Sequence, residues 1–415
     1  MKKPKPFYGY WIVAVAFLCM FITEGAAYYA FSLFYKPLQT EFGWGRGPIS
    51  VAWTIYYVIQ GLAAPIVGRM VDRYGARRLI IIGAIIGGLG FLWLTFMEGL
   101  WSFYGAYVVI GVGMTVMGFV PVTQVVSNWF NKRRGFALGI MSTGVGAGAV
   151  VIAQLVGCYL IPTFGWRVSY LALALMTWLL IIPPALLVIK TKPSDIGLYP
   201  DGVEATEAVV KSNLPSRGAG DWTLSMALKT STLWLIAIAY MMANFSNTSA
   251  ILHHVNHLTD IGFPLIMATG ALGGLGICSG MGRFFFGWLC DKIPAKYAAT
   301  ISFALQLSAI MVLMSVSSTS PQAMVWLYAI LMGIGVGGWL PTMSMVVSSN
   351  FGLAAYGAIF GVVSLAQGVG TAFGPLVAGQ MFDAMHTYWW VLVLLLVLYM
   401  VAITSILAVR RPKLV

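Results

Sequence analysis

The chain has 415 residues, of which 60% are hydrophobic and only 9% are charged, and its mean hydropathy is +0.87. Soluble globular domains carry about 25% charged residues, so this composition excludes a soluble protein and indicates a membrane protein with several spans. The formal net charge is +12, but the basic residues are scattered between apolar segments rather than gathered in one patch, which argues against a nucleic-acid partner.

Apolar runs of about 20 residues, bounded by charges, prolines or glycine clusters, predict twelve membrane spans. The basic start MKKPKP precedes an apolar run that is longer than the core of a signal peptide, so we expect a retained first helix. In chain order, the expected spans are residues 10–34, 48–69, 78–97, 101–125, 136–160, 168–189, 232–256, 264–288, 297–317, 322–347, 357–380 and 388–409.

The placement of Lys and Arg sets the expected orientation. With the N-terminus inside, all but four of the 24 basic residues fall in cytoplasmic segments. Lys36, Arg46 and Arg167 fall outside, and Arg283 falls within the membrane. This distribution follows the positive-inside rule, so we expect a multi-pass protein of the cell inner membrane with both termini in the cytoplasm.

One long polar segment divides six spans from six. Residues 190–229 carry five of the twelve acidic residues of the chain among Pro, Gly and Ser, which is typical of a linker rather than a folded domain. The expected division is therefore an N-terminal six-helix bundle at 1–190, a cytoplasmic linker at 191–230 and a C-terminal six-helix bundle at 231–415.

The two halves repeat each other at three places. The segment 68–73 (GRMVDR) aligns with 287–292 (GWLCDK), a shift of 219 positions, and 118–121 (GFVP) aligns with 338–341 (GWLP), a shift of 220. Three glycines around the fifth span align with three around the eleventh, a shift of 222: Gly135, Gly139, Gly157 with Gly357, Gly361, Gly379. Parallel repeats place a substrate site at their interface, so the expected fold class is an all-α membrane protein of two pseudo-symmetric six-helix bundles.

Arg283 lies inside the apolar run GICSGMGRFFFGWLCDK, residues 276–292. A guanidinium at the membrane centre costs roughly 2.5 to 3.5 kcal/mol on insertion scales, so it normally faces a wet cavity or a partner. We expect an anion to meet Arg283. The alternative is a purely structural role, in which Arg283 joins two helices through backbone carbonyl groups.

The loop GRMVDRYGARR, residues 68–78, resembles the signature of the major facilitator superfamily between its second and third helices, and the copy at 287–292 stands where that superfamily repeats it. The resemblance implies a transporter fold and gating roles for Asp72, Arg73 and Asp291. Asp72 could cap a helix end and pair with arginines that close the inner gate. The alternative is that these charges only set topology.

A narrower resemblance rests on NWFNKRRGFALGIMSTGVGAG at 128–148, FYGYWIV at 7–13 and KPSDIGLYPDG at 192–202. These segments are similar to the monocarboxylate transporter family, including its bacterial L-lactate transporters, and to the related oxalate/formate antiporters. The resemblance implies that Arg283 is the substrate-binding arginine of helix eight.

Three positions depart from the family pattern. An aspartate that animal members carry four residues before the arginine is Ser279 here, and their helix-one lysine aligns with Tyr29. Gln367 stands where the oxalate antiporter has a second cation. One buried cation suits one carboxylate, because a second negative charge in a low-dielectric cavity would stay uncompensated.

Two kinds of residue could carry a proton. Glu24 is the one acid well inside a predicted span, and His253, His254 and His257 lie toward the outer end of the seventh span. Because histidine titrates nearest to physiological pH, His253 is the first candidate and Glu24 the second. The alternative for all three histidines is hydrogen bonding within the protein.

Further residues are expected to line the substrate cavity by their pseudo-symmetric positions, although an aromatic residue at helical spacing can equally serve packing. Besides Arg283 and Ser279, the candidates are Tyr28, Phe119, Ser142, Val145, Trp339, Phe360, Ser364 and Gln367. The dense glycines, such as Gly144 and Gly370, are expected to allow close helix packing.

No cofactor, metal site or disulfide framework is expected. The four cysteines have no CxxC spacing, and the HHxxH run at 253–257 lacks a third ligand and a catalytic glutamate. The sequence shows no nucleophile–base pair that would indicate an enzyme. A cation or drug exporter would be expected to depend on a buried acid rather than on a buried cation such as Arg283. Two six-helix repeats also argue against a channel.

The expected mechanism is alternating access, in which Arg283 anchors the carboxylate and a proton neutralises the cavity before it reopens on the other side. The expected substrates are monocarboxylates such as L-lactate, carried across the lipid bilayer with a proton, and a single chain is expected to suffice. The alternative is an organic anion antiporter of the oxalate/formate type.

Overall fold

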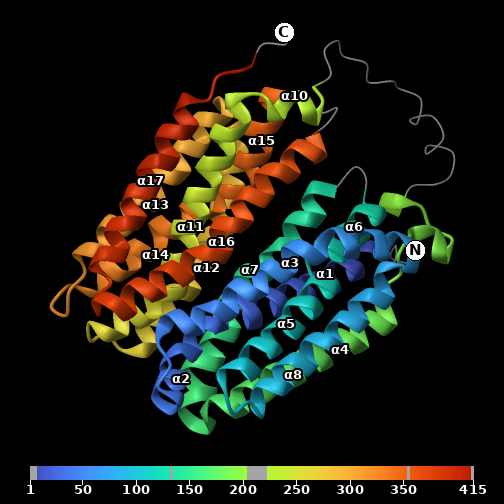
Figure 1. Cartoon of the computed structure of the whole chain (residues 1–415). Coiled ribbons are helices and arrows are strands. Elements are labelled where there is room, and N and C mark those ends of the chain that lie inside the picture. The colour runs from blue at the N-terminus through green and yellow to red at the C-terminus, as the bar shows by residue number, and fades with distance from the viewer. Residues whose placement is uncertain (1–6, 131–133, 203–221, 353–355, 413–415) are drawn as a thin grey trace, which may run out of the picture. The chain divides into compact units, whose positions relative to one another are not determined.

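The computed structural model describes residues 7–130, 134–202, 222–352 and 356–412, and within these ranges the chain is helical without a strand (Figure 1). The long helices are α1 (Gly9–Ile22), α3 (Arg46–Tyr74), α4 (Ala76–Thr95), α5 (Leu100–Met117), α7 (Arg134–Gln154), α8 (Ile161–Val188), α11 (Ser231–Asp260), α12 (Leu265–Lys292), α13 (Ala295–Ser315), α14 (Gln322–Gly337), α16 (Tyr356–Met385) and α17 (Trp389–Ala408). The shorter elements are η1 (Thr23–Tyr29), η2 (Ala30–Phe34), α2 (Tyr35–Phe42), α6 (Phe119–Trp129), η3 (Leu155–Leu160), η4 (Pro193–Ile196), η5 (Pro200–Gly202), α10 (Leu224–Leu228) and α15 (Trp339–Phe351).

Every predicted span falls on one helix or on two or three consecutive helical elements. Among the described residues, ten helical runs are long and apolar enough to cross a membrane, and one of them, Phe136–Val188, contains two predicted spans divided at Gly165. The remaining predicted span, 48–69, lies within α3. The prediction of an all-helical membrane protein is therefore confirmed.

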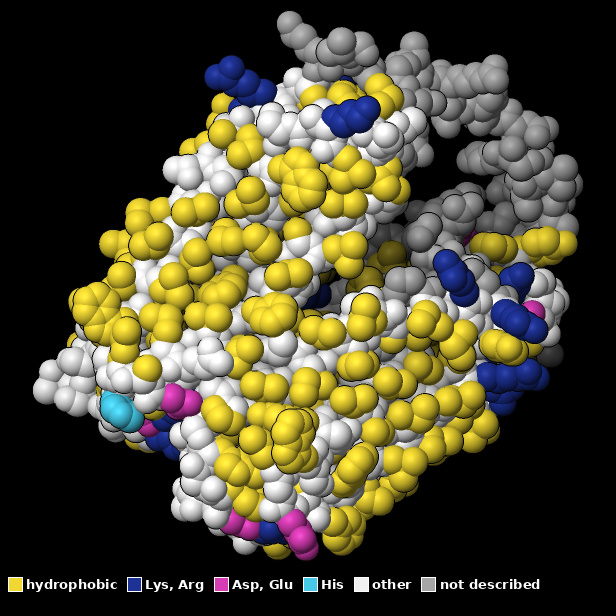
Figure 2. All heavy atoms as spheres, viewed as in Figure 1, with side chains coloured by type: hydrophobic (Ala, Val, Ile, Leu, Met, Phe, Trp, Pro, Cys, Tyr) yellow, Lys and Arg dark blue, Asp and Glu magenta, His cyan; other side chains and the backbone are white. Residues whose placement is uncertain are grey.

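Large apolar side chains cover much of the surface. Leu62, Trp101 and Leu187 are each more than two thirds exposed, and Figure 2 shows hydrophobic side chains along the sides of the helices, with Lys, Arg, Asp and Glu near their ends. Because a soluble protein rarely exposes apolar patches of this extent, the surrounding medium of these helices is lipid.

By packing, the chain forms two compact units that do not follow the order of the chain. The first unit is Met1–Tyr28, Ile59–Ile152 and Leu160–Arg217, and the second is Tyr29–Val58, Ala153–Tyr159 and Gly218–Val415. In the first unit α4 packs against α5 and α8, and in the second α13 packs against α14 and α17. These equivalent pairings show in the fold the repeat that the sequence predicts.

The repeat also appears as two equivalent helix interruptions. Between α5 and α6 the helix breaks at Gly118, and between α14 and α15 it breaks at Gly338. In both cases a proline follows three residues later, Pro121 or Pro341. A proline has no N–H to donate to the carbonyl group four residues earlier and its ring clashes with that group, which explains why both helices break here.

Candidate functional site

Arg283 lies on α12 in the second unit, where its side chain is half-buried. Ser279, one turn earlier on the same helix, is 5% exposed. Gly337 of α14 packs directly on this turn, because a Cβ there would lie 2.4 Å from the carbonyl oxygen of Ser279 and 2.7 Å from the amide nitrogen of Arg283. The backbone that carries Arg283 is therefore held firmly against α14.

Trp339 begins α15, which packs against both α12 and α16. Its side chain is half-buried, and its buried indole N–H has no acceptor among the described residues. Since a buried N–H is normally hydrogen-bonded, this donor is suited to a ligand that the protein does not itself supply. The predicted site residues of α16 are also half-buried: Phe360, Ser364 and Gln367.

The remaining predicted substrate residues and Glu24 lie in the first unit, around η1, a π-helical stretch within the first span. Glu24 and Tyr28 belong to η1 and are half-buried. The break at Gly118, just before Phe119, approaches Thr23 at the start of η1. Short π-helical stretches inside α-helices are frequent at functional sites.

Helix α7 borders η1 from another direction, since a Cβ on Gly25 would lie 2.9 Å from Cα of Gly148. Two predicted residues lie on α7 shortly before Gly148. Ser142 donates a hydrogen bond to the carbonyl group of Leu138 at 2.8 Å, and Val145 is half-buried. The segments that carry Glu24, Tyr28, Phe119, Ser142 and Val145 thus form η1 or lie close to it.

The predicted gating residues lie near the ends of α3 and α12. The side chain of Asp72 lies outside the described part of the chain. Arg73 is exposed, with its guanidinium group 5.2 Å from the ring centroid of Tyr74. Asp291 is exposed near the end of α12. Their gating roles stay a prediction.

His253 is buried in α11, and both of its ring nitrogens have partners. Nε2 lies 3.0 Å from the carbonyl oxygen of Pro375, and Nδ1 lies 2.9 Å from the hydroxyl oxygen of Tyr388. His253 is seven residues before the end of α11, whereas Arg283 is 18 residues after the start of α12. Both counts start from the turn that joins α11 to α12. At 1.5 Å per residue, Arg283 therefore lies about 16 Å further from this turn than His253 does.

The structure places a charged cluster beside His253 that sequence analysis missed. We call it the Arg46 cluster, and it consists of Arg46, Asp260, Asp383, Phe382 and Tyr388, all in the second unit. Nη2 of Arg46 lies 2.7 Å from a carboxylate oxygen of Asp260, Nη1 donates to the hydroxyl oxygen of Tyr388, and the guanidinium carbon lies 3.9 Å from the ring centroid of Phe382. Although Arg46 is predicted to lie outside the membrane, it is only 4% exposed.

Asp383 of α16 binds the first turn of α3. Its two carboxylate oxygens accept from the backbone N–H groups of Arg46 at 2.8 Å and Gly47 at 2.6 Å. An anion at a helix N-terminus is stabilised both by these free N–H groups and by the helix dipole. The start of α3 is thereby fastened to α16 as well as to α11.

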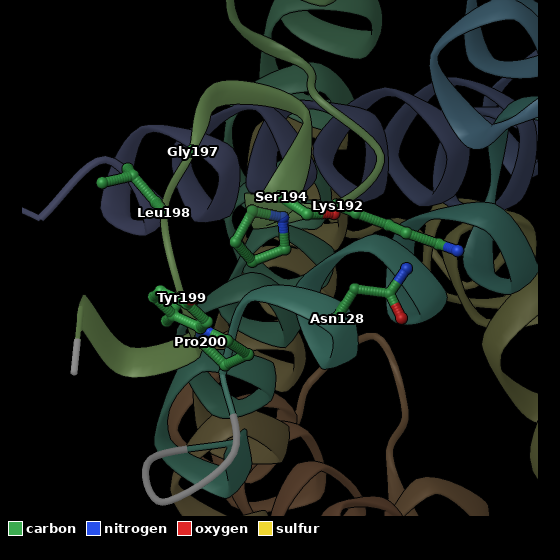
Figure 3. A pocket seen from close by; sticks show the side chains of 8 residues that line it. Asn128, Lys192, Ser194, Gly197, Leu198, Tyr199 and Pro200 are labelled. Atoms are coloured by element: carbon green, nitrogen blue, oxygen red, sulfur yellow. The ribbon is translucent and has the colours of Figure 1, made fainter. Parts of the chain in front are cut away.

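The predicted family segment at 192–202 forms a compact turn on the end of α6. Asn128 donates to the carbonyl group of Thr191 at 3.1 Å, and the indole N–H of Trp129 donates to that of Lys190 at 2.8 Å. A pocket of about 450 Å³ lies between this turn and α6, with Asn128 and Lys192 among its lining residues (Figure 3). It contains none of the predicted substrate residues.

Comparison with known proteins gives consistent results. A sequence profile of the Major Facilitator Superfamily matches residues 13–375. The chain is 22% identical to Monocarboxylate transporter 13 of Bos taurus, over 93% of this chain and 86% of that protein. It is also 22% identical to the Oxalate:formate antiporter of Oxalobacter formigenes, over 88% of this chain and 82% of that protein.

Two solved structures share the architecture. The nucleoside transporter NupG matches with a TM-score of 0.76 at 12% identity, over 97% of this chain and 99% of that one. A bacterial homolog of the human lysosomal transporter Spinster, in an inward-facing and unoccupied conformation, matches with a TM-score of 0.69 at 16% identity, over 98% and 95%. At these identities the likeness shows the fold alone.

Proposed function

Since the chain belongs to the major facilitator superfamily, we propose that this membrane transporter carries monocarboxylates such as L-lactate together with a proton by alternating access. Transport, rather than catalysis, is common to the relatives and to the fold. The finer assignment is supported chiefly by one observation. Arg283, a half-buried cation in the middle of an apolar helix, belongs to a chain whose relatives include monocarboxylate transporters.

The chemistry around Arg283 suits a single carboxylate. A guanidinium group offers a fork of N–H donors that matches the two oxygens of a carboxylate. The indole N–H of Trp339, which has no acceptor among the described residues, is a further donor in the same unit. Ser279 and Ser364 add small polar groups, so we propose Arg283 as the anchor and these residues as its supporting contacts.

Coupling to a proton follows from the charge of the substrate. Moving one negative charge into a cell that is negative inside costs roughly 2.3 kcal/mol per 100 mV, whereas an anion moving with a proton is electroneutral. We propose His253 as the first carrier of this proton and Glu24 as the second. The depth difference between His253 and Arg283 implies that proton and substrate bind at separate places.

An anion exchanger is the second candidate, because 88% of this chain aligns with the Oxalate:formate antiporter of Oxalobacter formigenes. An exchanger would require counterflow of a second anion and would move no proton. At the position in α16 where the oxalate antiporter is expected to have a second cation, this chain has the neutral Gln367. The absence of a second positive charge there favours a substrate with one negative charge. We therefore place symport first.

The proposed setting is the cell inner membrane, with both termini in the cytoplasm and a single chain sufficient for transport. The proposed domains remain 1–190 and 231–415, joined by the linker 191–230. Asp72, Arg73 and Asp291 are proposed to form the cytoplasmic gate, since they lie next to segments rich in basic residues.

The test is uptake of radiolabelled L-lactate into vesicles that contain a pH-sensitive dye, under an inward proton gradient. Wild type should show uptake with matched proton entry. Arg283→Ala should weaken substrate affinity by about 30-fold or more, the effect of removing one partner of a buried charge pair. Arg167→Ala is the matched control, because Arg167 is exposed and its loss should leave uptake unchanged.

Two results would overturn the proposal. Uptake that requires internal oxalate or formate and ignores the proton gradient would assign the chain to the exchangers. Uptake that Arg283→Ala and Arg167→Ala leave equally unaffected would make Arg283 a structural residue.

A further inference from the structure

A continuous hydrogen-bonded chain connects His253 to the Arg46 cluster. The carbonyl oxygen of Pro375 can only accept, so Nε2 of His253 carries a hydrogen, and in the neutral ring Nδ1 is the acceptor. The hydroxyl group of Tyr388 donates to this Nδ1, while its oxygen accepts from Nη1 of Arg46. A tyrosine hydroxyl group ordinarily keeps its proton at neutral pH, so Tyr388 has a hydrogen to donate.

In this chain each hydrogen has an acceptor only while His253 is neutral. A proton added at Nδ1 would make both ring nitrogens donors, and the Tyr388 hydroxyl would lose the acceptor for its own hydrogen. Its oxygen would then face two cationic donors, the imidazolium of His253 and the guanidinium of Arg46. Two like charges this close in a buried site repel each other strongly.

The surrounding charges do not absorb the added proton. Lys36 of α2 and Arg46 of α3 are balanced by Asp260 of α11 and Asp383 of α16, and the Lys36–Asp260 and Arg46–Asp260 ion pairs measure 2.8 and 2.7 Å. The titratable groups with rings near His253 and Tyr388 are Tyr35 at 5.2 Å from the His253 ring, and His257 at 5.3 Å from the Tyr388 ring. His254, next along α11, is bonded to the carbonyl group of Ile251. A protonated His253 therefore leaves the group with an excess positive charge.

We propose that the Arg46 cluster is a latch that holds residues 29–58 against α11 and α16, and that protonation of His253 releases it. This inference rests on the proposed proton-coupled alternating access. The latch lies at the end predicted to face outside, so a proton arriving from outside favours the open latch. Because linkage is reciprocal, closing the latch lowers the affinity of His253 for its proton and drives the proton onward.

Thr54 reports on the latch without taking part in it. Its side chain is 8% exposed, and its hydroxyl group donates to the carbonyl group of Ala372 on α16 at 2.7 Å. When residues 29–58 separate from α16, a cysteine at this position becomes accessible. The experiment uses the full chain without its native cysteines, reconstituted in vesicles, and measures the rate at which an impermeant thiol reagent labels the Thr54→Cys variant.

Labelling rates are divided by those of the Ser317→Cys variant, whose position is exposed in the turn between α13 and α14, because thiol reactivity itself depends on pH. From about pH 8 to about pH 4, a range that extends below that of an ordinary histidine because burial and the charge of Arg46 disfavour the imidazolium, the ratio should rise at least about fivefold, the lower end of typical coupling between two sites. Adding His253→Gln should abolish the rise, because a neutral amide keeps one donor and one acceptor but cannot take the proton. Tyr388→Phe should also abolish it, because the link between His253 and Arg46 is gone.

Arg46→Gln should give fast labelling at every pH, and Asp260→Asn serves the same purpose if Arg46→Gln fails to fold. A ratio that is flat in the parent protein, or that still rises in the His253→Gln variant, overturns the proposal. The assay contains no substrate, so it is independent of the uptake measurements. The labelling assay could show the pH dependence while the uptake assay shows anion exchange without proton flux. That combination would overturn the proposed symport and retain the proposed latch.

Discussion

At the scale of single residues, glycine decides how closely α12 approaches α14 beside Arg283. A Cβ on Gly282 would lie 2.3 Å from the carbonyl oxygen of Ile334, a backbone atom that cannot move without shifting the helix. Gly282→Ala should therefore destabilise the protein by about 1–3 kcal/mol, the usual cost of overpacking. The measurement is thermal unfolding of the full chain in detergent.

Gly280, two residues earlier on the same helix, is the matched control, because a Cβ there would meet nothing within 4 Å. Gly280→Ala should raise stability by up to about 1 kcal/mol through helix propensity alone. Opposite shifts of the two midpoints support the close approach of the helices. Equal midpoints would mean that α12 and α14 lie further apart.

Single residues also mark the limit of the sequence-based interpretation. Arg283 stands out because an arginine in an apolar run is costly wherever its helix packs. Arg46 did not stand out, because it lies beyond the end of an apolar run, where a charge carries no comparable cost. Its partners Asp260 and Asp383 lie 214 and 337 positions away in the chain. The predicted spans place all three residues on the outer side of the membrane, and this shared side is the signal that could have paired them.

At the scale of elements, the breaks before Phe119 and Trp339 are two sites where a helix can bend. Pro121→Ala and Pro341→Ala restore an N–H that can donate to the carbonyl groups of Met117 and Gly337. Removing an interior proline should stabilise each helix by up to about 3 kcal/mol. If transport requires these helices to flex, turnover should fall severalfold while the unfolding temperature rises.

Pro183→Ala is the control for these variants, since Pro183 lies inside α8 near its end and no helix is interrupted there. It should change stability without slowing turnover. Variants at 121 and 341 that transport as fast as wild type would show that the breaks are rigid. Both quantities can be measured on one reconstituted preparation, by counterflow of labelled substrate and by thermal unfolding.

The spans themselves were predictable because bilayer thickness fixes the length of an apolar run. The irregular segments were not. In η1 and η3 the chain is π-helical, although neither segment contains a proline. Gly25 of η1 touches Gly148, and Gly157 of η3 approaches Thr269, so contacts far along the chain, rather than local propensity, accompany these turns.

At the scale of the whole molecule, the chain repeat and the packing give two different divisions. The repeat follows from sequence alone, because pairs such as GFVP and GWLP keep their spacing. The grouping of residues 29–58 and 153–159 with the C-terminal helices depends on which neighbours the ends of these helices meet. Hydropathy carries no information on that choice. The predicted boundaries at 190 and 231 describe the chain order, and they stay a prediction for units that fold or move.

The predicted orientation of the molecule can be tested with two exposed serines, Ser194 after α8 and Ser317 after α13. Among the described residues, three helices long enough to span a membrane, α11, α12 and α13, separate them. The two positions must therefore lie on opposite sides if each of these three helices crosses the bilayer. The excess of Lys and Arg places Ser194 inside. In intact cells, an impermeant maleimide should therefore label the Ser317→Cys variant of the cysteine-free chain and spare the Ser194→Cys variant.

Opening the cells should make the Ser194→Cys variant reactive, which is the control for a cysteine that is exposed but on the other side. Labelling of the Ser194→Cys variant alone in intact cells would reverse the orientation. The Arg46 latch would then face the cytoplasm, and a proton from outside could not be the one that releases it. Labelling of both variants from outside would mean that one of these three helices does not cross the bilayer. The lengths of α11 and α12, at 30 and 28 residues, argue against that outcome, because about 20 residues are enough to span a membrane.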